Sequence, residues 1–382
     1  MCASVVGSVR VGLVTAEASG DWLAADLLRQ AAARAIPWQV QGIGGEVLES
    51  LGMQTWWSSQ SLNVRGYVEV LRHYRRIVSM RRALLQRFLR EPPRVFVGVD
   101  APDFNLPLAA QLRQAGVPTV QYVCPSVWAW RAQRLHAMRE ALDHVLCLFP
   151  FEVPMLERAG IAATFVGHPL AQHLPPQPDR TAARQHLGVD AAKGACVALL
   201  PGSRVSEVQH LLPVMLAALR QIAKARPVQA WLPVAPAVHA LVSQGVQRYG
   251  QGLNVTLCPG QAHQVLSACD VACVASGTAT LEAALCHAPT VVAYRMPRLS
   301  WWLTQRKRLQ PWVALPNILL QRELFPELLQ DACTADALAQ AALAWLDDEP
   351  ARHRMQHLAA TLHGQLRAPH PGLAYEAIQS FA

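Results

Sequence analysis

Lysine, acidic residues and long apolar runs are all scarce in this chain of 382 residues. Lysine occurs three times, so arginine carries most of the positive charge, and 34 Lys+Arg against 26 Asp+Glu leave a net charge of +8. No apolar run approaches the ~18–20 residues that a membrane-spanning helix needs, so we expect no such helix. Residues 1–15 are apolar but lack the basic start and the cleavage site of a signal peptide, and Arg10 interrupts them, so we expect a strand there.

The chain also lacks the cysteine spacing of a metal site. Its nine cysteines include no CxxC pair and are odd in number, so we expect reduced thiols in a cytoplasmic protein rather than a disulfide framework. No cluster of His and Glu accompanies Asp100 and Asp103, and we predict no metal ion and no cofactor. The basic excess instead indicates an anionic partner, which could be a nucleic acid, a phospholipid or a phosphorylated substrate.

Short apolar runs alternate with helical patterns along the chain, and this pattern occurs twice. Nearly continuous Val, Ile and Leu strands between helices predict parallel sheets buried on both faces. The polar, proline-rich segment 168–178 lies between the two copies and has the composition of a linker. We therefore predict an α/β protein of two doubly wound parallel-sheet domains, residues 1–170 and 180–350, facing each other across a cleft. The expected strands are 10–15, 38–42, 94–100, 118–123, 143–149, 163–166, 195–200, 228–233, 253–258, 270–275 and 290–294.

Ligands of such folds bind at the carboxyl ends of the strands, so the loops that follow strands carry the functional signal. Asp100 ends a buried strand, where partial loss of water makes a carboxylate a better base, and we favour a catalytic role for it. Asp103 follows a proline and precedes a helix, so we expect it to be an N-cap.

Three further loops follow strands in the first half. Residues 15–21 could let the backbone approach an anion at a helix start, or could form a turn capped by Ser19 or Asp21. The Gly-Ile-Gly-Gly sequence of residues 42–45 predicts a tight turn. The two tryptophans of residues 124–131 could stack on a sugar ring or line an acyl channel, although packing at a helix start explains them more simply.

The second domain carries two helix starts suited to a diphosphate. Arg204 adds a planar guanidinium to the first, with the alternative that Ser203 or Ser206 caps the helix and Arg204 is solvated. Residues 275–282 form the second, through a Ser-Gly-Thr turn, and Glu282 is placed to accept hydrogen bonds from ribose hydroxyls. Together these signals predict a site for a nucleotide diphosphate.

Segment 66–90 has the pattern of an amphipathic helix whose polar face is rich in arginine. Burial explains its apolar face, but an interfacial helix on anionic lipid also explains the arginines. Segment 299–309 repeats the aromatic and basic pattern, and because no RNP-like or helix-turn-helix motif accompanies it, we favour membrane contact over nucleic-acid binding. The predicted membrane-contact residues are Val70, Arg72, Tyr74, Arg75 and Arg76.

In their length and order, the motifs of this chain resemble those of the lipid-A-disaccharide synthase family of Gram-negative bacteria. The resemblance runs almost from end to end and is weakest from about residue 353 onward. One departure is Arg65, where related sequences often have an apolar residue. The motifs are Ala16–Asp21, Phe96–Asn105, Pro125–Arg131, Val166–Pro169, Leu199–Arg204, Ser276–Glu282, Tyr294–Met296 and Leu315–Asn317.

The resemblance implies an inverting glycosyltransferase of the GT-B type with two Rossmann-like halves. Such an enzyme transfers 2,3-diacylglucosamine from UDP to 2,3-diacylglucosamine 1-phosphate by a single displacement without a metal. The products are the β-1′,6-linked lipid A disaccharide 1-phosphate and UDP. The resemblance also implies a place at the cytoplasmic face of the inner membrane and a tail (353–382) that packs back on the first domain. In some relatives these tails are exchanged within a homodimer, so a homodimer is a possible partner state.

The resemblance also assigns roles to individual residues. Asp100 matches the general base that takes the proton of the acceptor's 6-hydroxyl, and Glu17 and Ser19 match the acceptor side. The predicted UDP site, in which the last two residues match family positions, comprises Arg204, Ser276, Gly277, Thr278, Glu282 and Asn317. Two other interpretations stay open. One is another GT-B enzyme acting on a UDP-sugar, such as a muramyl-type transferase or a 2-epimerase, and the other is a non-catalytic, membrane-bound nucleotide sensor.

Overall fold

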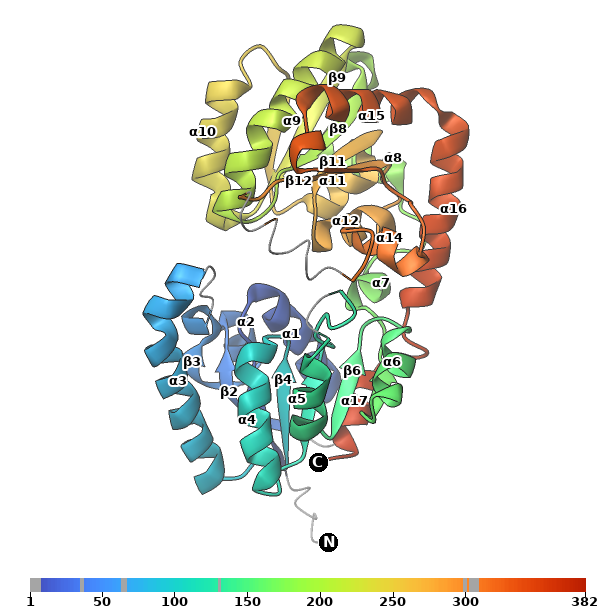
Figure 1. Cartoon of the computed structure of the whole chain (residues 1–382). Coiled ribbons are helices and arrows are strands. Elements are labelled where there is room, and N and C mark those ends of the chain that lie inside the picture. The colour runs from blue at the N-terminus through green and yellow to red at the C-terminus, as the bar shows by residue number, and fades with distance from the viewer. Residues whose placement is uncertain (1–7, 35–37, 63–66, 130–131, 298–300, 302–308) are drawn as a thin grey trace, which may run out of the picture. The chain divides into compact units, whose positions relative to one another are not determined.

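The computed structural model in Figure 1 describes residues 8–34, 38–62, 67–129, 132–297, 301 and 309–382. For residues 67–74 it describes the helical backbone alone. The chain divides into two units. Unit 1 comprises Met1–Gln172 with Leu366–Ala382, and unit 2 comprises His173–Gln365. The tail that belongs to unit 1 therefore begins at Leu366, later than the residue near 353 that we predicted.

Unit 1 is a seven-stranded sheet with helices on both faces. All strand pairs are parallel, in the order β3-β2-β1-β4-β5-β6-β7. The strands are β1 (Val9–Val14), β2 (Trp38–Gly44), β3 (Gln54–Ser58), β4 (Val95–Val99), β5 (Thr119–Tyr122), β6 (His144–Cys147) and β7 (Ala163–Phe165). The helices are α1 (Ala18–Ala32), α2 (Glu46–Ser50), η1 (Ser59–Leu62), α3 (Tyr67–Arg90), α4 (Pro102–Gln114), α5 (Arg134–Ala141), α6 (Glu152–Arg158), α7 (Pro169–His173) and α17 (Leu373–Gln379).

The six strands expected in the first half all form, and β3 is an addition. This edge strand is only half-buried, and its sequence lacks the continuous apolar run of a central strand. The segment was therefore not predicted as a strand. The predicted tight turn at residues 42–45 is wrong. Gly42 lies within β2 at φ 146°, and a Cβ there would lie 2.1 Å from the Leu13 carbonyl oxygen. Glycine at this position allows two strands to approach closely rather than the chain to turn.

Helices α3, α4 and α5 cover one face of the unit 1 sheet, and α1 packs on the other (Figure 1). Phe88 of α3 and Phe96 of β4 are both essentially unexposed, and their rings meet edge-on at 5.9 Å. The returning tail also joins this unit. Tyr375 of α17 stacks on Trp38 at 5.0 Å, and the Trp38 indole N–H donates to Gln379 Oε1 at 2.8 Å.

Unit 2 is a six-stranded parallel sheet in the order β10-β9-β8-β11-β12-β13. The strands are β8 (Ala195–Leu200), β9 (Val228–Val234), β10 (Val255–Pro259), β11 (Val271–Ala275), β12 (Thr290–Tyr294) and β13 (Glu327–Leu329). The helices are α8 (Arg180–Leu187), η2 (Ala191–Lys193), α9 (Val205–Ala225), η3 (Pro236–Val238), α10 (His239–Tyr249), α11 (Ala262–Ala268), α12 (Thr278–Leu285), α14 (Leu315–Leu320), η4 (Gln330–Ala332), α15 (Ala335–Asp347) and α16 (Glu349–Leu366). Five strands were predicted, and the short edge strand β13 was not.

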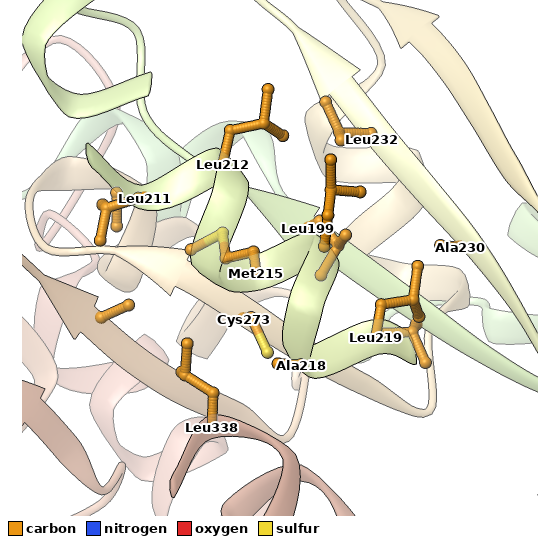
Figure 2. Packing of buried hydrophobic residues seen from close by; sticks show 14 of the residues in the cluster. Leu199, Leu211, Leu212, Met215, Ala218, Leu219, Ala230, Leu232, Cys273 and Leu338 are labelled. Carbon is orange, nitrogen blue, oxygen red and sulfur yellow. The ribbon is translucent and has the colours of Figure 1, made fainter. Parts of the chain in front are cut away.

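The core of unit 2 forms where α9 packs on the sheet between α10 and α15. Figure 2 shows Leu211, Met215 and Leu219 of α9, at helical spacing, close to Leu199 of β8 and Leu338 of α15. Each of these side chains is essentially unexposed, and burying one stabilises the fold by roughly 1.5–3 kcal/mol. This packing fixes the position of α9, whose first turn follows the loop after β8.

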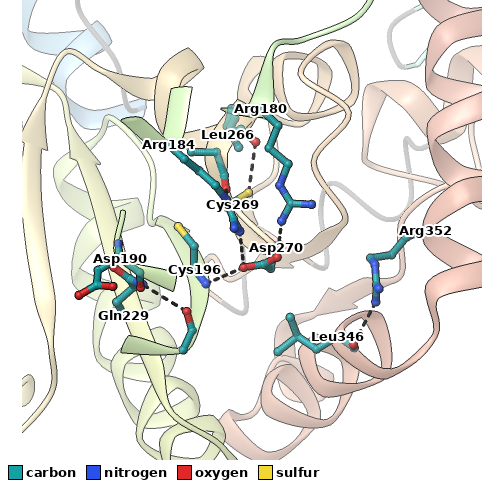
Figure 3. Close-up of polar contacts among 12 residues, drawn as sticks. Arg180, Arg184, Asp190, Cys196, Gln229, Leu266, Cys269, Asp270, Leu346 and Arg352 are labelled. Atoms are coloured by element: carbon teal, nitrogen blue, oxygen red, sulfur yellow. Dashed lines mark hydrogen bonds and ion pairs between the residues drawn. The ribbon is translucent and has the colours of Figure 1, made fainter. Parts of the chain in front are cut away.

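An ionic cluster closes the amino end of the unit 2 sheet (Figure 3). Asp270, just before β11, accepts from Arg184 Nη2 at 2.7 Å and from the Cys196 backbone N–H of β8 at 2.8 Å, and it also pairs with Arg180. Arg184 Nε donates to the Ala268 carbonyl at 2.9 Å. The cluster joins α8 to two central strands at the edge opposite the loops that bind ligands in such folds, so its role is structural.

Within the described part of the chain, no helix is both long enough and apolar enough to cross a membrane. The eight cysteines described there are all buried and form no disulfide.

Candidate functional site

Each sheet reverses its direction of winding at one point, and that point indicates where a ligand can bind. The reversal lies between β1 and β4 in unit 1 and between β8 and β11 in unit 2. Loops that follow the two strands at such a switch point diverge and leave a crevice at the carboxyl edge of the sheet. Unit 1 therefore has a candidate site in the residues after Val14 and Val99, and unit 2 has a candidate site of its own in the residues after Leu200 and Ala275.

Asp100 stands directly after β4, at the switch point of unit 1. It is half-buried, and its backbone is left-handed at φ 51°, as is that of Ala101 at φ 43°. Its N–H donates to the Tyr122 carbonyl at 2.9 Å, and its own carbonyl accepts from Asn105 Nδ2 and Gln121 Nε2, each at 2.8 Å. The sharp turn from strand to helix thus presents a carboxylate at the ligand-binding edge of the sheet.

Asp103 is not the N-cap that we predicted. Helix α4 begins at Pro102, with Ala101 as its N-cap, because the two left-handed residues turn the chain into the helix earlier. Asp103 lies in the first turn, where its exposed carboxylate pairs with Arg134 at the start of α5.

The buried carboxylate of Asp21 holds the loop after β1 in place through side-chain and backbone hydrogen bonds. Asp21 accepts from the hydroxyl of Thr15, from Ser59 Oγ at 2.7 Å and from the Gly45 N–H at 3.1 Å. It thereby joins the loops that follow β1, β2 and β3. A Cβ at Gly45 would lie 2.3 Å from Asp21 Oδ2, so any other residue there would displace the Asp21 carboxylate. Of the two alternatives for this loop, the cap by Ser19 or Asp21 is wrong, because the N-cap of α1 is Glu17.

Glu17 and Ser19 lie in the same loop region. Glu17 is the half-buried N-cap of α1, without a capping bond from its side chain, and Ser19 is exposed in the first turn. Because β1 and β4 are neighbours, the structure brings both residues and Asp100 to one edge of the unit 1 sheet.

The loop after β5 packs on a buried carboxylate. Trp128 Nε1 donates to Glu152 Oε1 at 3.0 Å, and the Phe149 N–H donates to Oε2 at 3.1 Å. The indole also meets Phe151 edge-on at 5.4 Å. Burial raises the pKa of Glu152 to about 8, so the group is protonated at neutral pH. Trp128 thus packs within unit 1, whereas residues 130–131 lie outside the described part.

A buried histidine lies beside this cluster. His168 stacks on Phe149 with ring centroids 5.9 Å apart, and its Nδ1 accepts the Leu170 N–H at 3.2 Å. Burial lowers the pKa of His168 to about 4, so the imidazole is neutral near pH 7 and carries its proton on Nε2.

A cavity of about 420 Å³ opens at the switch point of unit 2. Its wall is formed by loops after β8, β9, β10 and β11, together with the first turns of α9 and α12. Five of the predicted UDP-site residues line it, namely Arg204, Ser276, Gly277, Thr278 and Glu282. The structure therefore brings together two segments about seventy residues apart in the sequence, as the switch-point argument requires.

The start of α12 lies in this cavity without a side-chain cap. Gly277 is its N-cap at φ 143°, and no side-chain capping bond is formed. Gly277 and Thr278 are exposed, and no atom lies within 4 Å of where a Gly277 Cβ would stand. Backbone N–H groups at such a start, together with the helix dipole, favour an anion.

The start of α9 is capped by its own glutamate rather than by Ser203 or Ser206. Glu207 Oε2 accepts the N–H groups of Ser203 and Arg204 at 3.2 and 3.3 Å, and Oε1 accepts from Arg204 Nη1 at 2.8 Å. Neither Ser203 nor Ser206 caps the helix. Gly202 makes room at φ 106°, since a Cβ there would lie 2.4 Å from Glu207 Oε2. The three-residue spacing from N-cap to glutamate was the available signal.

Glu282 and Asn317 have different surroundings. Glu282 lines the cavity and pairs with His263 Nε2 at 3.2 Å. Asn317 is fully buried outside the cavity wall, where its amide accepts from the Leu324 and Phe325 N–H groups and donates to Glu327 Oε1 at 3.0 Å. The structure thus does not place Asn317 with the other predicted UDP residues.

Asn317 is nevertheless connected to the cavity through its neighbours. Glu327 accepts the N–H groups of Val313 and Ala314, just before α14, and the Val313 carbonyl accepts from Ser276 Oγ at 3.3 Å. Asn317 therefore supports the Ser276 turn through Glu327.

Helix α3 has the amphipathic character expected of segment 66–90. Leu84 and Phe88 are fully buried, whereas Arg75 and Arg76 are exposed. Arg87 lies over the ring of Trp56 at 4.9 Å, so this arginine packs on β3. The side chains of Val70, Arg72 and Tyr74 lie outside the described residues, as do Arg65 and most of segment 299–309.

Among the residues described, no group of three or more His, Cys, Asp or Glu side chains is arranged to hold a metal ion.

Solved structures show which fold this arrangement has. A UDP-GlcNAc 2-epimerase from Neisseria meningitidis, bound to UDP-GlcNAc, aligns with a TM-score of 0.61, covering 93% of this chain and 98% of that one at 11% identity. MurG from Acinetobacter baumannii aligns with a TM-score of 0.60, covering 98% and 100% at 13% identity. At these identities the likeness shows the fold alone, which is the GT-B fold of two parallel-sheet α/β domains.

Sequence comparison gives a closer relationship. Residues 11–378 match the family described as lipid-A-disaccharide synthetase. A lipid-A-disaccharide synthase of Albidiferax ferrireducens is 49% identical over 377 residues, covering 97% of each chain. The protein of the same name from Verminephrobacter eiseniae is 46% identical over 378 residues, also covering 97% of each. The chain therefore belongs to the lipid-A-disaccharide synthase family.

Proposed function

We propose that this protein transfers 2,3-diacylglucosamine from its UDP donor to the 6-hydroxyl of 2,3-diacylglucosamine 1-phosphate. The products are the β-1′,6-linked disaccharide 1-phosphate of lipid A and UDP. The proposal rests on the groups that lie at the switch points of the two sheets, in a chain that belongs to this family. Unit 1 presents the carboxylate of Asp100, and unit 2 presents a cavity with an uncapped helix start.

The reaction is a single displacement with inversion. Asp100 takes the proton of the acceptor hydroxyl as its oxygen attacks the anomeric carbon, and the bond to the UDP oxygen breaks. Glu17 and Ser19, at the same edge of the unit 1 sheet, contact the acceptor. A carboxylate on the turn of a rigid sheet suits this role because the base must be held in one geometry relative to the hydroxyl.

Unit 2 binds the donor and stabilises the leaving group. The diphosphate lies at the start of α12 among Ser276, Gly277 and Thr278, and Glu282 accepts hydrogen bonds from ribose hydroxyls. Arg204 meets the negative charge that grows on UDP, which requires it to exchange Glu207 for phosphate oxygens. Because these groups supply the positive potential, we propose that the reaction needs no metal.

The lipid substrates place the enzyme at a membrane surface. We propose peripheral association with the cytoplasmic face of the inner membrane through the start of α3, with Arg75 and Arg76 exposed there and Val70, Arg72 and Tyr74 on the same segment.

The test is product formation by the purified protein. It is incubated with the UDP-diacylglucosamine donor and the 1-phosphate acceptor in excess EDTA, and the disaccharide 1-phosphate and UDP are quantified by mass spectrometry. We expect both products in equal amounts. Binding of UDP without turnover would favour a nucleotide sensor, and epimerisation of UDP-GlcNAc would favour a 2-epimerase. Activity that is lost in EDTA and restored by Mg²⁺ would contradict metal independence.

A further inference from the structure

The backbone turn that carries Asp100 is conformationally unfavourable. Asp100 and Ala101 are consecutive non-glycine residues with φ of 51° and 43°. A Cβ makes the left-handed region costly, so such residues persist only where the surrounding structure holds them. The Asp100 N–H bond to Tyr122 continues the β4–β5 ladder but does not account for the turn that follows.

Two buried amides hold this turn. Asn105, one turn into α4, and Gln121, in β5, are both fully buried and come from separate elements. Their side-chain NH₂ groups each donate to the Asp100 carbonyl oxygen at 2.8 Å. A carbonyl oxygen can only accept, so this contact fixes the orientation of both amides.

Within the described part of the chain, the two amides leave buried polar atoms without hydrogen bonds, which is unfavourable in a protein interior. The amide oxygens of Asn105 and Gln121 are buried and have no hydrogen-bond partner among the described residues. Leucine and methionine have similar volumes and would remove the two unpaired amide oxygens, but they would leave the Asp100 carbonyl without either amide donor. The contact with this carbonyl therefore points to a role beyond packing for the two amides.

Gly98 provides the space that this contact needs. A Cβ on Gly98, in β4, would lie 2.9 Å from Asn105 Cβ and from Gln121 Oε1. Glycine two residues before Asp100 thus lets the two amides converge below the end of the strand.

We propose that Asn105 and Gln121 are positioning residues, which hold the backbone of Asp100 in the left-handed conformation from which its carboxylate takes the acceptor proton. The inference rests on the proposed function, in which Asp100 is the general base. It assigns the two amides an effect on turnover that passes through Asp100 and leaves substrate binding unchanged.

The test uses Asn105→Leu and Gln121→Met, which keep volume and remove the donors. The control is Gln111→Met, which removes an exposed amide on α4 that donates to the Pro107 carbonyl. We expect kcat to fall about 10–100-fold in both test variants, with KM for both substrates within about twofold of wild type. The control should keep wild-type kcat. UDP binding and the melting temperature report on folding in each variant.

A double-mutant cycle separates positioning from a general structural effect. In an Asp100→Asn background, Gln121→Met should lower the residual turnover no further, because the carboxylate that it positions is absent. An equal loss in both backgrounds would overturn the inference and leave the proposed function intact. Full turnover in Asp100→Asn itself would instead overturn the assignment of the base.

Ala101→Gly provides a second route, including for a test variant that folds poorly. Glycine adopts the left-handed region readily, so adding this change should restore part of the lost kcat. A loss that Ala101→Gly leaves unchanged would contradict the proposal.

Discussion

Asp100 directly follows β4, whereas Asp103 lies in the first turn of α4 and pairs with Arg134. We predict that Asp100→Asn lowers kcat by about 10²–10⁴-fold, the range for a positioned base, with little change in donor affinity. Steady-state kinetics with both substrates measure this. Asp103→Asn, which removes a carboxylate from the same turn, is the control and should keep most of the activity. Equal turnover by the two variants would remove Asp100 from the mechanism.

Arg204 must leave Glu207 before it can meet a diphosphate. We predict that Arg204→Ala weakens UDP binding by roughly 1.5–3 kcal/mol, the magnitude of a charged hydrogen bond, measured by calorimetric titration. Arg220→Ala is the control, because this arginine lies on the same helix and donates to backbone carbonyls near Tyr249. Glu207→Gln should tighten UDP binding, since it releases the guanidinium. Unchanged affinity in Arg204→Ala would show that Arg204 has no part in the donor site.

At the scale of single elements, burial decides what the sequence reveals. The central strands were predicted because a parallel strand covered on both faces contains an almost continuous run of Val, Ile and Leu. Strands β3 and β13 were not predicted; both lie at sheet edges and contain no more than two apolar residues in a row. Loop geometry depends on partners distant in the sequence, such as Asp21 with Ser59, and no local pattern encodes them.

The candidate site also contains residues that a local sequence pattern predicts and residues whose roles depend on distant partners. Asp100 and the Ser276–Thr278 turn could be predicted because position after a buried strand is itself the signal. The positioning amides could not, since Gln121 lies in a strand and its contact with Asp100 depends on the neighbouring strand. Asn317 lies in a clear sequence motif, but its side-chain amide forms hydrogen bonds within its own loop.

The loop after β5 predicts a dependence of stability on pH. Burial raises the pKa of Glu152 from its usual 4.5 to about 8. The folded state therefore retains a proton that the unfolded state loses above about pH 4.5. The stability that this provides is complete below that pH and is lost as pH rises to about 8. Melting temperatures of wild type and Glu152→Gln between pH 5 and 9 test this.

The glutamine variant mimics the protonated acid, so it should gain stability relative to wild type across this window, on the order of a few kcal/mol. A difference between the two proteins that does not vary with pH would show that Glu152 titrates normally. Glu140→Gln, an exposed glutamate on α5, is the control.

At the scale of the whole molecule, the net charge of +8 and the exposed arginines of α3 predict salt-sensitive membrane binding. Each arginine near an anionic surface contributes up to ~1 kcal/mol, and the Debye length shrinks to about 3 Å at 1 M salt. A variant with Arg72, Arg75 and Arg76 changed to Gln should therefore sediment less with anionic vesicles at low salt. High salt should reduce binding of the wild type.

The matched control changes three exposed arginines elsewhere in unit 1, Arg29, Arg139 and Arg158, to Gln. It removes the same charge and should sediment like wild type. Equal loss in both variants would indicate attraction by net charge alone, and no salt dependence would identify α3 as an ordinary core helix with a solvated face.

The division of the chain also determines the order in which its parts can be completed during synthesis. Unit 2 is inserted within unit 1, between Gln172 and Leu366. When the first 172 residues leave the ribosome, Trp38 still lacks the ring of Tyr375, and the His168 N–H lacks the Leu366 carbonyl that accepts it at 2.8 Å. All the residues of unit 2 are available for folding before the last 17 residues close unit 1. The half of the protein that is made first is therefore the half that is finished last.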